Sequence, residues 1–227
     1  MHRIRTVAVA AGALVAAVAG SALAAPTAPK PPKPPAGAAR ASLSAKPAIV
    51  TWGQATTFAG RITGTNGAVT VELQRDPYPL GDGWLVQKTV TTQRNGTYSV
   101  SALPTVNTSY RVAARTPAAA ASTPVLVRVR PRIGLSLSTS APAAGGRVRF
   151  YGSVRPAHDG RSVAIQKRTP SGTWTTVARA TLRDAGATRS AYSTRIAIRR
   201  DGTYRVKLAA HADHLAGYSR ERAIAVG

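Results

Sequence analysis

The chain has 227 residues, of which 31 are lysine or arginine and 8 are aspartate or glutamate, so its formal net charge at pH 7 is +23. It contains no cysteine, which excludes a disulfide framework, a cysteine-based metal site and a thiol nucleophile. Residues 131–227 carry the largest share of the excess charge, with 17 basic and 5 acidic side chains. A surface this positive attracts polyanions.

Residues 1–24 have the pattern of a secretory signal peptide. Two arginines precede an apolar run over residues 7–18, and residues 22–24 offer a small-x-small cleavage site. The apolar run is short and rich in alanine, which disfavours a membrane anchor. Residues 25–40 are proline-rich and predict a semi-rigid linker of polyproline II form. A ligand for a proline-recognising domain is the less favoured interpretation of this linker.

The remainder of the chain contains one pattern twice. Equivalent residues lie 90 to 94 positions apart, as in the pairs Phe58 and Phe150, Gly60 and Gly152, Gln74 and Gln166, Trp84 and Trp174, and Tyr98 and Tyr192. This period is too long for a solenoid unit and fits a duplicated small domain. We therefore predict two domains, one at residues 41–130 and the other at residues 131–227.

Each copy alternates apolar and polar residues, which is the period of a β-strand. In the second copy Val148, Phe150 and Val154 point to one side of their strand. Asp159-Gly160 and its counterpart Asn66-Gly67 predict tight hairpin turns. Seven short antiparallel strands in about 90 residues predict an all-β fold with two tandem immunoglobulin-like sandwiches. A small barrel is the competing fold.

Two segments resemble known sandwich domains. Asp201-Gly202-Thr203-Tyr204 looks like the tyrosine corner of immunoglobulin-like domains, where a tyrosine bonds back to the chain. A second motif, Asn95-Gly96-Thr97-Tyr98-Ser99-Val100, is similar to one that is common in bacterial surface sandwich domains. Together the copies resemble the tandem immunoglobulin-like domains of secreted actinobacterial proteins over roughly residues 41–227. This resemblance implies a spacer, adhesion or carbohydrate-binding role, usually without catalysis.

An arginine-rich face of the second domain is the main candidate site. If the apolar residues of two strands face inward, their alternate residues share the outward face of one sheet. Guanidinium forks bind carboxylate, phosphate and sulfate groups in bidentate fashion, and a tyrosine among them could stack on a sugar or base. The alternative is a solvated face whose arginines reflect the codon bias of a GC-rich genome. The candidate polyanion-binding residues are Arg147, Arg149, Tyr151, Arg155, Arg195 and Arg199.

The sequence also contains a cluster of potential metal ligands. His211, Asp213 and His214 lie together in a late loop, and two imidazoles with a carboxylate can bind zinc or a similar ion. Spacing of this kind in a loop favours an ordinary polar loop, so no metal site is predicted.

The tryptophans allow two interpretations. Trp84 and Trp174 recur with the period of the core, which favours burial over an exposed sugar-stacking platform. Trp52 has no counterpart and is the freer candidate for a surface contact.

Catalysis finds little support. The sequence has no G-x-S-x-G motif, and the first copy has no histidine that could complete a triad. The acids of the first copy, Glu72, Asp76 and Asp82, lie near one strand and the loop after it, so a paired-carboxylate hydrolase lacks a second acid-bearing scaffold. We predict no enzyme activity and no cofactor.

These observations predict a secreted bacterial protein at or near the cell envelope, with no transmembrane span in the mature chain. Its expected partner is an anionic envelope polymer or polysaccharide, or another surface protein. Specific nucleic-acid recognition is disfavoured, because a basic sandwich binds nucleic acid weakly whatever its role. The alternative is a purely structural spacer, or a protein-binding adaptor, with no polymer ligand.

Overall fold

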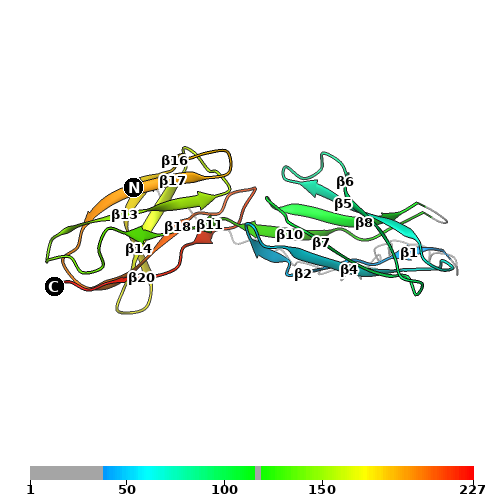
Figure 1. Ribbon diagram of the computed structural model, residues 1–227, viewed down its shortest axis with the longest axis horizontal. Helices are drawn as coiled ribbons and strands as arrows, with labels where there is room; N and C mark the ends of the chain where they lie inside the picture. The colour runs from blue at the N-terminus through cyan, green and yellow to red at the C-terminus, as the bar shows by residue number, and fades with distance from the viewer. Residues whose placement is uncertain (1–37, 116–118) are drawn as a thin grey trace, which may run out of the picture. The chain divides into compact units, whose positions relative to one another are not determined.

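The computed structural model describes residues 38–115 and 119–227, which form strands and loops without any helix (Figure 1). The predicted signal peptide and most of the predicted linker lie outside these residues. Among the residues described, no helix has the length and apolarity needed to cross a membrane. The described residues belong to one compact unit.

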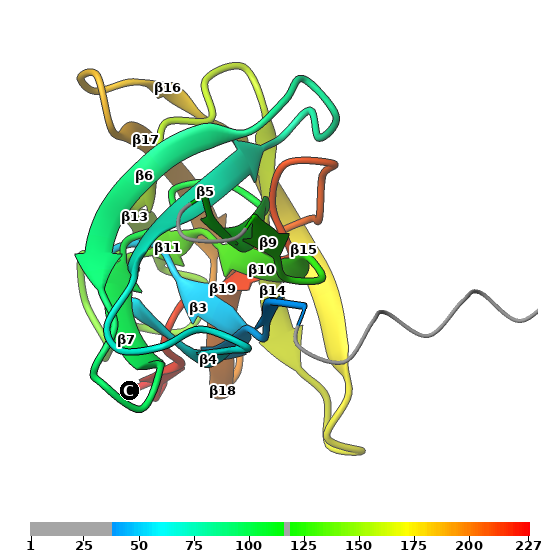
Figure 2. The same cartoon turned by 90° about the vertical axis from the view of Figure 1, so that its right-hand side faces the viewer.

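The first sandwich has two sheets. In one sheet β4 (Thr56–Thr63) pairs with β1 (Arg40–Ala41), β2 (Ser44–Lys46) and β7 (Thr97–Ala102). The other sheet has the order β3 (Ile49–Thr51), β10 (Val125–Arg130), β8 (Thr108–Ala114), β5 (Thr70–Pro77) and β6 (Leu85–Thr91), and the short β9 (Ala120–Ala121) pairs with β8. Figure 2 shows this sandwich in front, with β5 and β6 in the foreground. All pairs are antiparallel except that of β3 with β10, which is parallel.

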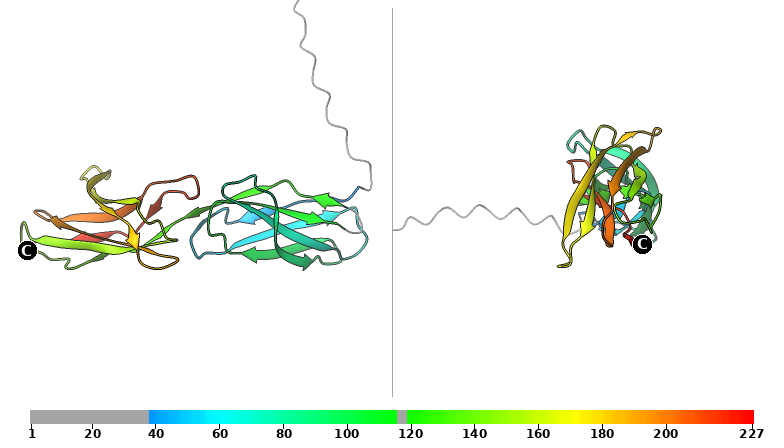
Figure 3. Two further views of the ribbon diagram at one scale, coloured as in Figure 1. Left: turned by 90° about the horizontal axis from the view of Figure 1, so that it is seen from above. Right: turned by 90° about the vertical axis from the view of Figure 1, so that its left-hand side faces the viewer.

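The second sandwich repeats this plan, and its strands can be followed toward the red C-terminus in Figure 3. One sheet contains β11 (Arg132–Ile133), β12 (Ser136–Leu137), β13 (Arg147–Arg155), β17 (Ser190–Ala197) and β16 (Arg183–Asp184). The other contains β15 (Trp174–Thr181), β14 (Ser162–Arg168), β18 (Gly202–Leu208), β19 (Gly217–Tyr218) and β20 (Arg222–Ile224). In immunoglobulin lettering these sheets are A-B-E-D and C′-C-F-G. The strand order therefore confirms the predicted all-β fold of two immunoglobulin-like sandwiches.

Alternation along the strands builds each core. On β13, Val148, Phe150 and Val154 are completely buried, whereas Arg147 and Arg149 are exposed. Phe150 packs edge-on against Tyr204 of the opposite sheet, with ring centroids 5.2 Å apart. The equivalent Phe58 lies 4.4 Å from Tyr110 in the first sandwich. With no disulfide available, these apolar layers carry the stability of both sandwiches.

The predicted hairpins at Asn66-Gly67 and Asp159-Gly160 are wrong. Gly67 and Gly160 have the positive φ angles of 81° and 77° that a tight turn requires, so the turns themselves form. However, each turn connects strands that belong to different sheets, as β13 and β14 do. Turn residues fix the local backbone direction, whereas the buried faces of the strands decide which strands pair.

In each sandwich a tyrosine side chain lies over the glycine of the paired strand. Its hydroxyl bonds to a backbone carbonyl near the start of that sandwich. Tyr192 on β17 is paired with Gly152 on β13, and its hydroxyl donates to the carbonyl oxygen of Gly134 at 2.6 Å. A side chain at position 152 would collide with the Gly134 carbonyl and crowd the Tyr192 hydroxyl. This Tyr-Gly lock joins three strand segments across one sheet through a single side chain.

The first sandwich contains the same Tyr-Gly lock. Tyr98 pairs with Gly60, and its hydroxyl donates to the carbonyl of Ser42. Burial raises the pKa of Tyr98 to about 12 and that of Tyr192 further, so both hydroxyls remain protonated donors. The sequence repeat at these four residues thus has a physical cause, because the tyrosine needs the glycine beneath it.

This bond replaces the predicted tyrosine corner. The hydroxyl that bonds back to the chain belongs to Tyr192 rather than to Tyr204, which forms no such bond within the described residues. The Tyr204 ring is 3% exposed and fills the core beside Phe150. The pattern Asp-Gly-Thr-Tyr therefore marks a core aromatic residue at the start of β18.

We expect Tyr192→Phe to lower the free energy of unfolding by about 1 kcal/mol, because the Gly134 carbonyl loses its donor while the ring stays packed. Urea unfolding followed by circular dichroism measures this change. Tyr151→Phe is the matched control, since that ring lies outside the core cluster of the same sandwich, and it should change stability by less than about 0.5 kcal/mol. Equal losses in both variants would contradict a stabilising role for the Tyr192 hydroxyl.

Candidate functional site

The register of β13 and β17 places four of the predicted residues on one outward face. Arg149 pairs directly with Arg195, and Arg147 and Tyr151 are the next residues on the same side of β13. Phe150, between them, points into the core. We call the set Arg147, Arg149, Tyr151 and Arg195 the basic strip.

The arginines of the basic strip do not stabilise the free protein by their mutual arrangement. Like charges directly opposite each other on two strands repel, as Arg149 and Arg195 do. The Arg149 guanidinium also lies over the Tyr151 ring, with its carbon 4.3 Å from the ring centroid. Stacking of this kind restrains the guanidinium while its N–H groups stay available to an anion.

The other two predicted residues lie near opposite ends of the strip. Arg155 is the last residue of β13, and Arg199 is exposed two residues beyond the end of β17. The eight steps along β13 from Arg147 to Arg155 correspond to about 27 Å of extended chain. The structure therefore distributes the six predicted residues along the paired strands β13 and β17 and the segment after β17, rather than around one point.

Arg155 also lines a groove that the sequence did not predict. The groove has a volume of about 960 Å³, and its charged lining side chains are Arg132, Arg155, Arg220 and Arg222. We call this the basic groove. Its lining also includes residues 51–54, residues 133–136, Ser153 and Tyr218.

Two aromatic rings accompany these arginines. Trp52 lines the basic groove, and the Arg155 guanidinium carbon lies 6.0 Å from its ring centroid. Tyr218 lines it as well and is 39% exposed. Trp52 was the tryptophan predicted to be free for a surface contact. The groove thus combines cationic forks with flat apolar rings, which is the chemistry of a site for charged sugars or other ring-bearing anions.

The arginines of the second sandwich have no carboxylate partners within the described part of the chain. The arginine–carboxylate ion pair found there, Arg115 with Glu72 at 3.8 Å, belongs to the first sandwich. Four of the five acids of this sandwich accept hydrogen bonds within it instead: Ser190 donates to Asp159, the Gly186 N–H to Asp184, the Val226 N–H to Asp201 and His211 to Asp213. The positive charge is therefore left unneutralised at the surface.

Sequence reasoning missed most of the basic groove because its arginines come from distant segments. Arg132 opens the sandwich, whereas Arg220 and Arg222 close it, and the fold brings these ends together. The sequence did contain a signal for part of the groove. Arg220 and Arg222 alternate with Glu221, so the two arginines share one side of an extended segment. Glu221 does not line the groove.

The predicted burial of Trp84 and Trp174 in the cores is wrong. Both rings are half-buried, and each is covered by an arginine that alternates with core residues, Arg111 on β8 and Arg205 on β18. Arg111 lies 4.3 Å from the centroid of Trp84, and Arg205 lies 4.1 Å from that of Trp174. The two tryptophans recur because the same tryptophan–arginine stack lies on an outer face of each sandwich. The spacing of a repeat does not tell which face of a sheet is buried.

A glutamine completes each of these stacks. Arg111 Nε donates to Gln74 at 2.8 Å, and Arg205 Nε donates to Gln166 at 3.0 Å. Arg205 also lies 4.5 Å from the ring of Tyr218, which lines the basic groove. The stack of Trp174, Arg205 and Tyr218 therefore supports one wall of the groove.

We expect Arg205→Gln to reduce the free energy of unfolding by about 1 kcal/mol, because two rings lose their contact with the planar cation. Tryptophan emission should shift to longer wavelength as Trp174 becomes more hydrated. Arg179→Gln on the same sheet removes one exposed charge without a cation–π contact among the described residues and serves as the control. An unchanged emission maximum in Arg205→Gln would count against the stack.

No family model matches the chain, and no curated protein matches it. Among the solved structures that resemble the chain, two are similar over 83% of its length. One is a tetra-tandem repeat in the extending region of a large adhesion protein, with 16% identity and a TM-score of 0.38, and the chain spans 49% of its length. The other is bovine butyrophilin, with 12% identity, a TM-score of 0.43 and 99% of its length covered. The assignment of the fold rests on the strand order and not on these likenesses.

Proposed function

We propose that the protein is a secreted, non-catalytic binding module of the cell envelope, and that its second sandwich holds an anionic polymer along the basic strip and the basic groove. One observation carries the proposal: within the described residues, the arginines of these two surfaces have no carboxylate partner. Unpaired guanidinium groups beside exposed rings are suited to external anions.

The arrangement favours a polymer over a small anion. An exposed ion pair contributes only about 0.5 kcal/mol, so a single carboxylate or phosphate would bind weakly at any one of these arginines. Arg155 belongs both to the strand that carries the basic strip and to the basic groove, so one extended ligand can contact both surfaces. Repeated anionic groups on one chain then add their contacts at high effective concentration.

The chemistry favours a polysaccharide that carries carboxylate or phosphate groups. Arginine forks match both groups, and the rings of Trp52, Tyr151 and Tyr218 offer flat surfaces on which sugar rings can stack. Export is supported by the pattern of residues 1–24 and by the resemblance of the repeats to domains of secreted actinobacterial proteins. A fold stabilised without disulfides needs no oxidising step after export.

The proposal predicts salt-sensitive binding to polyanions. We expect the full chain to bind polygalacturonate or polyphosphate, and to bind neutral dextran at least about tenfold more weakly, with affinity falling as sodium chloride rises. The triple variant Arg147→Ser, Arg149→Ser and Arg195→Ser should lose at least about tenfold in affinity, because three contacts of about 0.5 kcal/mol are removed. Biolayer interferometry on immobilised polymer measures both effects.

The control removes the same charge from the first sandwich. Arg40, Arg94 and Arg128 are exposed there, and their replacement by serine lowers the net charge equally. An equal loss of affinity in this variant would show attraction by overall charge and would contradict a site on the second sandwich. Absence of binding by the unmodified chain to every polyanion would favour a structural spacer or a protein-binding adaptor instead.

A further inference from the structure

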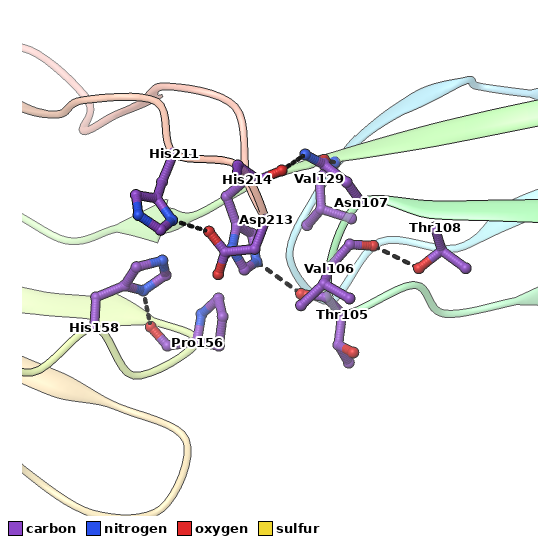
Figure 4. Close-up of polar contacts among 11 residues, drawn as sticks. Thr105, Val106, Asn107, Thr108, Val129, Pro156, His158, His211, Asp213 and His214 are labelled. Carbon is purple, nitrogen blue, oxygen red and sulfur yellow. Dashed lines mark hydrogen bonds and ion pairs between the residues drawn. The ribbon is translucent and has the colours of Figure 1, made fainter. Parts of the chain in front are cut away.

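All three histidines of the described residues lie in one cluster with an aspartate (Figure 4). His158 comes from the loop between β13 and β14, whereas His211, Asp213 and His214 come from the loop between β18 and β19. His158 was not predicted to join the others, because 53 residues separate it from His211. The fold brings the rings of His158 and His214 to a centroid distance of 4.9 Å.

Backbone carbonyls fix the protonated nitrogen of both buried rings. His158 Nδ1 lies 2.8 Å from the carbonyl oxygen of Pro156, and His214 Nε2 lies 2.8 Å from that of Thr105. A carbonyl only accepts hydrogen bonds, so each of these nitrogens carries a proton and donates. In the neutral rings the lone pairs therefore belong to His158 Nε2 and His214 Nδ1.

Neither of these two nitrogens has a hydrogen-bond partner within the described residues, although both are buried. Their side chains are 7% and 3% exposed, respectively. Asp213 Oδ2 lies 3.0 Å from His214 Nδ1, within ion-pair distance, but the two atoms are not aligned for a hydrogen bond. Two buried acceptor atoms without donors are unfavourable unless something positive lies between them.

The two buried histidines and Asp213 bring potential ligand atoms close together. Ligand atoms of His158, Asp213 and His214 all lie within 4.8 Å of one another. Tetrahedral zinc, with bonds of about 2.0–2.2 Å, keeps its ligand atoms about 3.3 Å apart. The carbonyl bonds to the far side of each imidazole are the interactions that usually orient metal-binding histidines.

His214 Nδ1 and Asp213 Oδ2 lie 3.0 Å apart. A protonated His214 paired with Asp213 would be the simpler explanation of that contact, but it leaves His158 Nε2 without a partner.

We propose that His158 Nε2, His214 Nδ1 and Asp213 Oδ2 bind a divalent transition metal, with zinc as the best match. Two imidazole nitrogens and one carboxylate oxygen are borderline ligands of the type that zinc selects over calcium or magnesium. A water molecule, or His211 after rotation of its exposed ring, would complete the coordination.

The metal would stabilise the junction between the two sandwiches. The loop that carries Asp213 and His214 already contacts the first sandwich: Asn107 N–H donates to the Asp213 carbonyl at 2.8 Å, and Leu215 N–H donates to the Val129 carbonyl at 2.8 Å. The second ring nitrogen of His214 bonds to Thr105, as described above. Coordination would tie this loop to His158, so the docked loop would lose freedom to move.

Titration of the full chain, purified without a polyhistidine tag, tests the proposal. Isothermal titration calorimetry with zinc should give one ion per chain and a Kd below about 10 µM. Cobalt should give the visible absorption of a tetrahedral site. Asp213→Asn should weaken zinc binding about 10- to 100-fold, whereas Asp184→Asn, which removes a carboxylate from an exposed turn, should bind as the unmodified chain does.

Zinc binding weaker than about 100 µM, or equal affinity in Asp213→Asn and the unmodified chain, would overturn the assignment. A thermal measurement does not depend on the folding of any variant. Saturating zinc should raise the Tm of the chelator-treated, unmodified protein by about 5 °C or more. An unchanged Tm would equally count against the site. Polyanion binding is measured separately, so failure of either proposal leaves the other intact.

Discussion

The hydroxyl of Tyr192, crossing Gly152 to the carbonyl of Gly134, is the contact on which the candidate site depends most. It adds a side-chain bond to the backbone pairing that already joins the short strands β11 and β12 to β13. Gly134 lines the basic groove, and Arg132 precedes it by two residues. A buried hydrogen bond inside the sheet therefore helps to position one wall of the groove. The charged side chains of the groove take no part in this bond.

The two copies share this frame but differ in what they present to solvent. Both retain the Tyr-Gly lock and the stack of tryptophan, arginine and glutamine, so duplication preserved the interactions that hold the sheets in shape. The unpaired arginines of the strip and the histidine cluster belong to the second copy. Arginines on an outer face and histidines in loops can differ between the copies without disturbing either core, and they are the residues on which both proposals rest.

Strand positions and the inward side of each strand were predictable, because alternation around Phe150 and Phe58 directly encodes burial. That Arg149 and Arg195 share the outward face of one sheet followed from the same alternation, whereas their direct pairing did not. Pairing partners did not follow: Asp159-Gly160 has the chemistry of a hairpin turn, yet it connects two sheets. The assembly of the groove from both ends of the second sandwich, and the addition of His158 to the other two histidines, could not be predicted. Both bring together residues that are distant in sequence, and local periodicity carries no information on such contacts.

The repulsion between Arg149 and Arg195 has a consequence for evolution of this surface. Substitutions that neutralise either residue would relieve a strain in the free protein, so selection for folding alone would erase the pair. Under the proposed function, an anion bound by both guanidinium groups would offset this repulsion. Stability of the free protein and capture of a ligand would then place opposite demands on the same pair.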